Sequence, residues 1–197
     1  METTAIRQAE RSEFTRAAQA LARAFYDDPV VQHVWPHEAK RLRRSELSFA
    51  AQMRALRSRR EIHVDEDFGT VAVWARPDEW EIPTTALVRV LPTWLRTRVG
   101  VGSLLAYLRT DALHPDEPHW YLEFLGTVPQ RQGQGLGGRV LEPVLKQADE
   151  MGVPVWTWSS NRRNLAFYHR QGFAVLDEIP FAAGGPPIFP IRREPRA

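Results

Sequence analysis

A turn rich in glycine lies between an apolar segment and a segment with helical spacing, over residues Gln132–Gly138. Its sequence is Gln-Gly-Gln-Gly-Leu-Gly-Gly. The first turn of a helix has unpaired backbone N–H groups at the positive end of the helix dipole, and glycine lets an anion approach them without a Cβ in the way. The turn therefore predicts a site for a phosphate or pyrophosphate group. The alternative is that the glycines serve only a tight connection from strand to helix.

The spacing of Gly133, Gly135 and Gly138 also satisfies the G-x-G-x-x-G pattern of dinucleotide-binding folds. Such a site needs an acidic residue about 20 positions further on, at the end of the next strand, to hold the ribose. Here the next predicted strand ends at Trp158-Ser159-Ser160, which contains no carboxylate. A P-loop is excluded as well, because no Gly-Lys-Ser/Thr sequence follows the glycines.

The size and composition of the chain limit what surrounds this turn. The chain has 197 residues, of which 43% are hydrophobic and 25% are charged, and this suits one globular domain over residues 1–197. It has no cysteine, which excludes disulfide bonds, thiolate metal sites and thiol nucleophiles. Its six histidines lack the paired spacing of metal-binding helices, so we expect no metal site.

Charge and hydropathy exclude two classes of partner. The 26 Lys and Arg residues against 24 Asp and Glu give a formal net charge of +2, too small for a general attraction to nucleic acid. No apolar run approaches the about 18 residues that a membrane span needs, and the first residues are polar, unlike a secretory signal. We therefore expect a cytoplasmic protein with no nucleic-acid partner and no membrane partner.

Hydrophobic spacing and turn residues predict the elements that must position the turn. Helices are expected from Ser12 to no further than Asp28, over 38–59, over 83–113 with interruptions at its proline and glycines, over 139–150 with a bend at Pro143, and over 161–171. Strands are expected over 3–8, 62–64, 70–75, 119–127, 153–158, 173–179 and 188–192. Because strands and helices mix without strict alternation, the fold class is α+β or mixed α/β around one central sheet.

Two motifs resemble the acetyl-CoA signature of the GNAT superfamily of N-acetyltransferases. Gln132, Gly135 and Gly137 match the first motif, Q/R-x-x-G-x-G/A, which follows a strand. The second motif combines an asparagine, a tyrosine and a Gly-Phe pair at fixed distances downstream. It is matched by Asn161, Tyr168, Gly172 and Phe173. The two motifs cover residues 118–176.

The resemblance implies a single domain whose twisted central sheet is mixed, mostly antiparallel and flanked by helices. It also implies transfer of an acetyl group from acetyl-CoA to an amine by direct attack. Segments such as Val71–Trp74 and Arg163–Tyr168 are similar to the branch that includes puromycin N-acetyltransferase, although Trp158 stands where that branch tends to have a carboxylate. The implied acceptor is then a primary amine of a small molecule, an antibiotic or a secondary metabolite, in a resistance or biosynthetic role.

By this resemblance the glycine turn binds the pyrophosphate, and the backbone of Leu125–Thr127 pairs with the pantetheine arm like an added strand. The expected acetyl-CoA-binding residues are Leu125, Gly126, Thr127, Gln132, Gly133, Gln134, Gly135, Leu136, Gly137, Gly138 and Asn161. Asn161 would hydrogen-bond the pantetheine arm, and it also suits a helix N-cap. Tyr168 is the family's usual general acid, since a phenol with a pKa of about 10 can return a proton to a thiolate. Its alternative role is that of a core aromatic residue beside Phe167.

Glu123 is the only charged residue in the apolar segment Trp120–Leu125. A lone carboxylate in such a strand is costly unless it is paired or faces a pocket. Strand alternation predicts Tyr121, Glu123 and Leu125 on one face. Two interpretations stay open: Glu123 takes the proton of the amine through a water molecule, or it is paired with an arginine elsewhere in the sheet. His119 is a second candidate for the base.

The acceptor side is expected in the N-terminal half of the chain, where no motif identifies it. Tyr26, Trp35 and Trp158 are candidates for the wall of the acceptor pocket. The residues that choose the acceptor are expected within 25–35 and 79–113. A peptide or protein N-terminus, or a small metabolite or polyamine, stays open as the acceptor, and a non-catalytic CoA-binding sensor stays open as another class. Either a monomer or a homodimer is compatible with the sequence.

Overall fold

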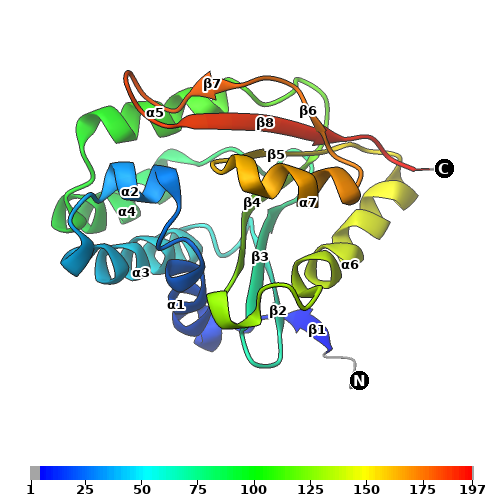
Figure 1. The fold of residues 1–197 in the computed structure, drawn as a ribbon, viewed down its shortest axis with the longest axis horizontal. Coiled ribbons are helices and arrows are strands. Elements are labelled where there is room, and N and C mark those ends of the chain that lie inside the picture. The colour runs from blue at the N-terminus through cyan, green and yellow to red at the C-terminus, as the bar shows by residue number, and fades with distance from the viewer. Residues whose placement is uncertain (1–4, 197) are drawn as a thin grey trace.

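A computed structural model describes residues 5–196, which form one twisted sheet with helices on both faces (Figure 1). The strands are β1 (Ile6–Gln8), β2 (Glu61–Asp65), β3 (Thr70–Ala75), β4 (Trp120–Thr127), β5 (Val155–Ser159), β6 (Ala174–Val175), β7 (Ile179–Pro180) and β8 (Pro187–Arg193). The helices are α1 (Phe14–Ala24), α2 (Pro29–Val34), α3 (Glu38–Ala55), α4 (Thr84–Thr97), α5 (Val101–Asp111), α6 (Leu136–Met151) and α7 (Leu165–Arg170). The expected mixed, mostly antiparallel sheet flanked by helices is confirmed.

The strand order is β1-β2-β3-β4-β5-β8-β6, with β7 pairing to β8. Every pairing is antiparallel except that of β4 with β5, which is limited to Trp120 with Val155 and Tyr121 with Trp156. Beyond these two pairs the strands separate. No strand of residues 5–196 therefore pairs with the later part of β4 on the side of β5, and the backbone of Leu125–Thr127 has an edge open to a ligand.

The core lies on both faces of the sheet. On one face, α1 and α3 bury their apolar sides against β2 and β3, with Leu21, Phe49 and Val73 at the centre of the cluster. On the other face, α6 and α7 pack against β3, β4, β5 and β8. A bidentate ion pair joins the buried Arg193 in β8 to the partly exposed Asp149 in α6, with both N···O distances at 2.7 Å. These contacts fix α6, and therefore the turn that precedes it, relative to the sheet.

Several elements differ from the expectations. The helix over 83–113 is two helices, since Arg98 adopts a left-handed conformation after α4, while Pro92 lies inside α4 without ending it. The strand over 173–179 is reduced to the two-residue strands β6 and β7. A helix, α2, begins directly after Asp28. Of the strand expected over 3–8, its first residues, Thr3 and Thr4, lie outside the described residues.

Pro143 lies inside α6, which is continuous from Leu136 to Met151.

None of the helices within residues 5–196 combines the length and the apolarity that crossing a membrane requires.

Candidate active site

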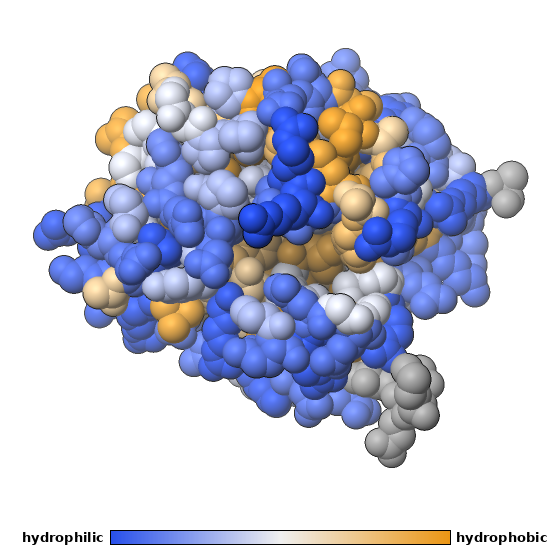
Figure 2. All heavy atoms as spheres, in the orientation of Figure 1, coloured by the Kyte–Doolittle hydropathy of each residue, from blue (hydrophilic) through white to orange (hydrophobic). Residues whose placement is uncertain are grey.

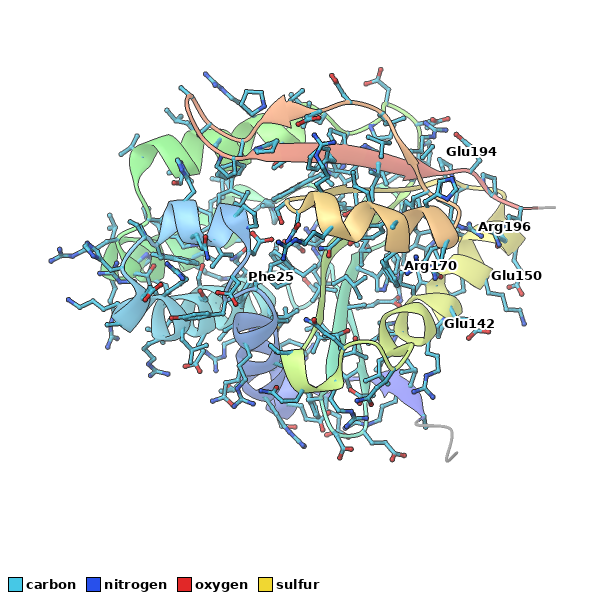
Figure 3. The ribbon with its side chains drawn as sticks, viewed as in Figure 1. Phe25, Glu142, Glu150, Arg170, Glu194 and Arg196 are labelled. Atoms are coloured by element: carbon cyan, nitrogen blue, oxygen red, sulfur yellow. The ribbon has the colours of Figure 1, made fainter. Side chains whose placement is uncertain are left out.

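A large open groove, with a volume of about 730 Å³, lies where β4 and β5 separate. Figure 2 shows the hollow on this face of the molecule, with apolar atoms in its depth and hydrophilic atoms around its rim. Phe25, after α1, and Arg170, on α7, lie at its two sides (Figure 3). All the expected acetyl-CoA-binding residues except Gln134 line this groove. They are Leu125, Gly126, Thr127, Gln132, Gly133, Gly135, Leu136, Gly137, Gly138 and Asn161. The side chain of Gln134 instead donates a hydrogen bond to the Gln130 carbonyl, 3.3 Å away.

The glycine turn has the geometry that an anion site needs. Gly133 and Gly135 both have φ of +76°, a left-handed conformation that favours glycine. Gly135 is the N-cap of α6, and no side chain caps the N–H groups of the first turn. A Cβ added at Gly133 or Gly135 would meet no heavy atom within 4 Å, so the space beside the turn is open. The turn therefore fits a pyrophosphate, which would accept hydrogen bonds from these N–H groups.

Two further glycines of the groove are required by packing. A Cβ at Gly126 would lie 2.8 Å from the Cβ of Ala24, so this glycine allows α1 to approach β4. A Cβ at Gly137 would lie 3.3 Å from the ring of Phe167, so that glycine allows α7 to approach α6. The Gln132 amide donates to the Thr127 carbonyl at 3.0 Å and ties the turn to β4. Close packing and an open binding surface thus use different glycines of the same segment.

A β-bulge at Glu123 changes the predicted faces of β4. β3 pairs Val73 with Phe124 and Trp74 with Leu122, which leaves Glu123 as an extra residue. After the bulge, Phe124 packs on the side of α1 and α3, and Leu125 packs on the side of α6. The prediction that Leu125 shares a face with Tyr121 and Glu123 is therefore wrong, because strict alternation fails at a bulge. The bulge turns both Glu123 and Phe124 toward a second cavity.

Tyr168 lies in α7, where it is 7% exposed, packs against Phe167 and Phe173, and lines the groove. It therefore has the contacts of a core aromatic residue, and it lines the same groove as the open edge of β4. Burial, and secondarily the carboxylate of Asp28, raise the pKa of the Tyr168 hydroxyl above its ordinary value, so the phenol keeps its proton. Such a group can donate a proton but has little tendency to lose one spontaneously.

Asp28 is a site residue that the sequence did not identify. Its Oδ1 accepts from the backbone N–H groups of Val30 and Val31, at 3.0 and 3.1 Å, and so caps α2. Its Oδ2 accepts from the Ser160 hydroxyl at the end of β5. Burial raises the pKa of this carboxyl. The sequence signal was the Asp-Pro pair, which is typical of a helix N-cap followed by its first residue.

Asn161 also has a capping role. Its side-chain oxygen accepts a hydrogen bond from the backbone N–H of Arg163 at 3.0 Å. Asn161 lines the groove, as Tyr168 does. The alternative role that the sequence allowed, a helix N-cap, is thus present in the structure. Its position in the lining leaves the amide group available to a ligand as well.

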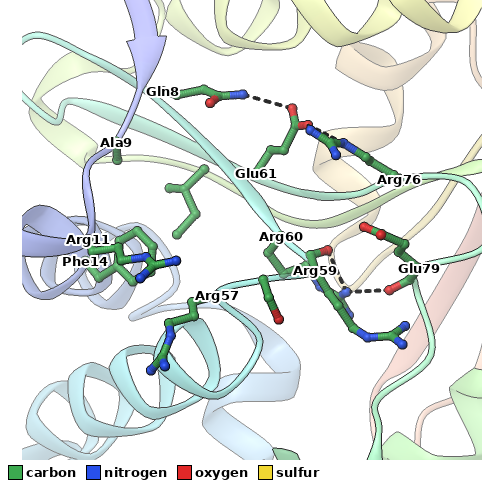
Figure 4. Close-up of a pocket in the computed structure, with 12 residues that line it drawn as sticks. Gln8, Ala9, Arg11, Phe14, Arg57, Arg59, Arg60, Glu61, Arg76 and Glu79 are labelled. Atoms are coloured by element: carbon green, nitrogen blue, oxygen red, sulfur yellow. Dashed lines mark hydrogen bonds and ion pairs between the residues drawn. The ribbon is translucent and has the colours of Figure 1, made fainter.

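Glu123 forms a buried ion pair with the guanidinium of Arg60, at side-chain exposures of 8% and 1%. Arg60 also donates to the carbonyls of Arg59, Glu79 and Trp80, at 3.1, 2.8 and 2.9 Å. It thereby clamps the loop after β3 to the bulge of β4. Figure 4 shows Arg60 and its bond to Glu79 from the side of a smaller cavity, about 260 Å³, on the outer side of this clamp. The arginine partner that the sequence left open for Glu123 is Arg60.

We name the second cavity the acceptor pocket because we propose that it holds part of the acceptor; its volume is about 70 Å³. Trp35 and Trp158, two of the three aromatic residues that the sequence offered as candidates, line this cavity together with Glu123. Tyr26 lines neither this pocket nor the groove. Its hydroxyl lies 3.5 Å from the Glu38 carbonyl, and the guanidinium of Arg41 lies over its ring.

Asp111, at the end of α5, also lines the acceptor pocket and had no signal in the sequence. Burial, followed by the charge of Glu123, raises the pKa of its carboxyl.

His119 lines neither cavity. Its Nδ1 donates to the Glu117 carbonyl at 2.8 Å, its Nε2 is 2.9 Å from Nδ1 of His114, and its imidazole is fully buried. No group of three or more metal-ligating side chains occurs in the part of the chain that the structure describes.

The model of the acetyltransferase (GNAT) family matches residues 22–173, and the chain belongs to this family. An uncharacterized N-acetyltransferase of Schizosaccharomyces pombe is 26% identical over 190 residues, which are 89% of this chain and 76% of the yeast protein. The protein is thus a GNAT N-acetyltransferase, with the acetyl-CoA use and amine acceptor that this family implies.

Solved structures show the same fold. A Corynebacterium glutamicum structure described as histone acetyltransferase HPA2 and related acetyltransferase gives a TM-score of 0.73 at 22% identity and covers 98% of this chain and 96% of that one. A Drosophila melanogaster polyamine N-acetyltransferase gives 0.58 at 16%, with 96% and 99% covered. The Escherichia coli ribosomal-protein-S18-alanine N-acetyltransferase gives 0.56 at 17%, with 98% and 95% covered. At these identities the likeness concerns the fold alone.

Proposed function

We propose that this enzyme transfers the acetyl group of acetyl-CoA to a primary amine of a small molecule by direct attack. The amine nitrogen forms a bond to the thioester carbon, the carbon–sulfur bond breaks, and the amine proton leaves to a base. Tyr168 donates its proton to the departing thiolate. The single observation that supports this most is the buried phenol of Tyr168 in the lining of the groove that the glycine turn also lines.

Acetyl-CoA would lie along this groove. The N–H groups from Gly133 to Gly138 would bind the pyrophosphate, and the open edge of Leu125–Thr127 would pair with the pantetheine arm. Arg23, Arg163 and Arg170 also line the groove and supply positive charge for the phosphates. Asn161 would add a hydrogen bond to the pantetheine arm.

Glu123 is the proposed base, acting through a water molecule, and its ion pair with Arg60 is the alternative role. The variant Glu123→Gln separates the two roles because it keeps the shape and removes the charge. A base predicts a lower rate near neutral pH with partial recovery in alkaline buffer, where more acceptor is a free amine. A structural ion pair predicts a lower melting temperature with normal turnover per folded molecule.

The narrow acceptor pocket favours a small molecule over a peptide or protein N-terminus. A volume of about 70 Å³ admits one slender group, and most of its lining comes from side chains in the first two-thirds of the chain. The similarity of several segments to the branch that includes puromycin N-acetyltransferase supports an antibiotic or secondary-metabolite amine. We further propose a cytoplasmic enzyme that acts as a monomer or a homodimer.

Release of CoA tests this function directly. Because the chain has no cysteine, a thiol reagent added to enzyme, acetyl-CoA and an amine detects only the CoA that is formed. We expect release with at least one small primary amine and none with peptides of free N-terminus. Acetyl-CoA binding by calorimetry without release for any amine would favour a non-catalytic sensor, and release with peptides alone would favour the peptide acceptor.

A further inference from the structure

The acceptor pocket has the chemistry of a site for an organic cation. Eight aromatic side chains line it, from α3, α4, α5, β4, β5, the residue after α2 and the loop after β3. They are Trp35, Phe49, Trp80, Trp94, Tyr107, Tyr121, Phe124 and Trp158. The faces of such rings attract a positive charge, most strongly where water is excluded. Two carboxylates, Asp111 and Glu123, and one guanidinium, that of Arg60, are the charged groups of the lining.

Asp111 is the carboxylate of this pocket that lacks a counter-ion. Within residues 5–196 its side chain takes part in no ion pair and in no side-chain hydrogen bond, whereas Glu123 is paired with Arg60. The charge of Arg60 lowers the pKa of Asp111 but only partly offsets the effect of burial, and its donors are used by Glu123 and three backbone carbonyls. A half-buried carboxylate among aromatic rings is costly unless a cation joins it.

The acceptor nitrogen that becomes acetylated must lie outside the acceptor pocket. Attack occurs at the thioester, and the thioester must be close enough to Tyr168 for the proton transfer, so the reacting nitrogen lies in the groove. The groove and the acceptor pocket share no lining residue. They adjoin at a cluster of rings, where Phe25 of the groove packs against Phe49 and Phe124 of the pocket, with ring centroids 5.7 and 6.3 Å apart. An acceptor that occupies both therefore presents its far end to Asp111.

We propose that the acceptor is a slender diamine or related dication, with its second cationic group held by Asp111 and the surrounding aromatic rings. An apolar spacer joins this group to the nitrogen that is acetylated, and the lining supplies Val31, Val34 and Leu104 to contact it. This inference rests on the proposed function and names its substrate class. It distinguishes Asp111, which binds the far cation, from Glu123, whose charge Arg60 already compensates.

Calorimetry on the enzyme saturated with CoA tests the proposal without turnover. Straight-chain diamines with three to seven methylene groups are titrated beside the monoamines of equal length. For the best spacer we expect the diamine to bind at least about tenfold more tightly than its monoamine. Asp111→Asn should remove most of that difference and leave the monoamine unchanged. Asp116→Asn, in the exposed loop before β4, should alter neither affinity.

Two results would overturn the inference. One is equal affinity of diamines and monoamines for the unmodified enzyme at every spacer length. The other is a loss shared by diamine and monoamine in Asp111→Asn, with a melting temperature that shows an intact fold. The thiol assay separates this failure from that of the proposed function, because a working acetyltransferase releases CoA with a monoamine acceptor whether or not Asp111 discriminates.

Discussion

The groove and the acceptor pocket are built in opposite ways. The groove is wide, about 730 Å³ against about 70 Å³, and the glycine turn gives it a surface of backbone N–H groups from one contiguous segment. The pocket is made of side chains from elements far apart in the chain, and a buried ion pair holds it together. A site made of backbone can tolerate many changes around it, whereas a site made of packed side chains depends on each contact.

The groove and the acceptor pocket also differ in the charge of the side chains that line them. Arginines line the groove, where a ligand with several phosphates is expected. In the pocket the single guanidinium is already bound to Glu123, and the remaining carboxylate, Asp111, favours a cation. The proposed acetyl-CoA site and the proposed site for the far cation would therefore use opposite electrostatics.

Arg60 offers the largest expected effect on the pocket. Arg60→Met leaves the Glu123 carboxylate buried without its partner, and we expect the free energy of unfolding to fall by about 3 kcal/mol or more. Arg76→Met is the matched control, since Arg76 is 59% exposed and its pair with Glu61 should contribute about 1 kcal/mol or less. Urea denaturation of both variants measures the difference. Equal losses would show that the clamp does not support the fold.

Tyr168→Phe tests the chemistry of the groove. Loss of the phenolic proton should lower kcat about 10²-fold and leave acetyl-CoA affinity nearly unchanged, because proton donation acts in the transition state. Tyr26→Phe removes the same hydroxyl outside both cavities and should keep full activity. Turnover that survives in Tyr168→Phe would make Tyr168 a structural residue and water the proton donor.

Gly135→Ala tests whether the turn binds phosphate through its backbone. We expect the acetyl-CoA dissociation constant to rise about tenfold, a loss of about 1.4 kcal/mol, because the added Cβ blocks the approach to the N–H groups. Gly152→Ala provides the control. Gly152 ends α6 with φ of +66° and open space around its Cβ position, so both variants should lose similar stability. If both also weakened acetyl-CoA binding equally, backbone strain rather than the site would explain the loss.

The substitution Asp28→Asn should have the smallest effect, which is a change in how the free energy of unfolding depends on pH. An unfolded aspartate has a pKa of about 3.9, and burial raises that of Asp28 in the folded state. As pH rises through the interval between the two values, the folded state binds more protons, so this carboxyl lowers the stability of the unmodified enzyme. Asp28→Asn keeps a cap for α2 and removes this decline.

The test of Asp28 is the difference in unfolding free energy between Asp28→Asn and the unmodified enzyme, measured from about pH 3 to about pH 7. We expect this difference to shift in favour of the variant as pH rises. Asp149→Asn should behave in the opposite way, since its ion pair with Arg193 lowers the pKa of Asp149 and stabilises the fold above the unfolded value. A constant difference for Asp28→Asn would show that burial does not perturb its carboxyl.

The sequence by itself determined the groove and the class of the fold. Gln132–Gly138 predicted a helix start with exposed N–H groups, and the structure has that geometry, because glycine conformation and helix termination depend on residues next to each other in the chain. Asn161 and Tyr168 could be identified from the sequence because they belong to one short segment, in which the distance between them is fixed. Strand and helix periodicity likewise placed most of the sheet, the short strands β6 and β7 apart.

Only the tertiary structure decided the pocket. Arg60 and Glu123, which both line the pocket, are 63 residues apart, so the pair leaves no pattern in a local window. The bulge at Glu123 depends on how β3 pairs with β4, and it reversed the predicted face of Leu125. Asp111 comes to line the same cavity as eight aromatic side chains only when the chain folds. Burial and charge pairing are properties of the packed chain, and they decide what a side chain such as Asp111 can bind.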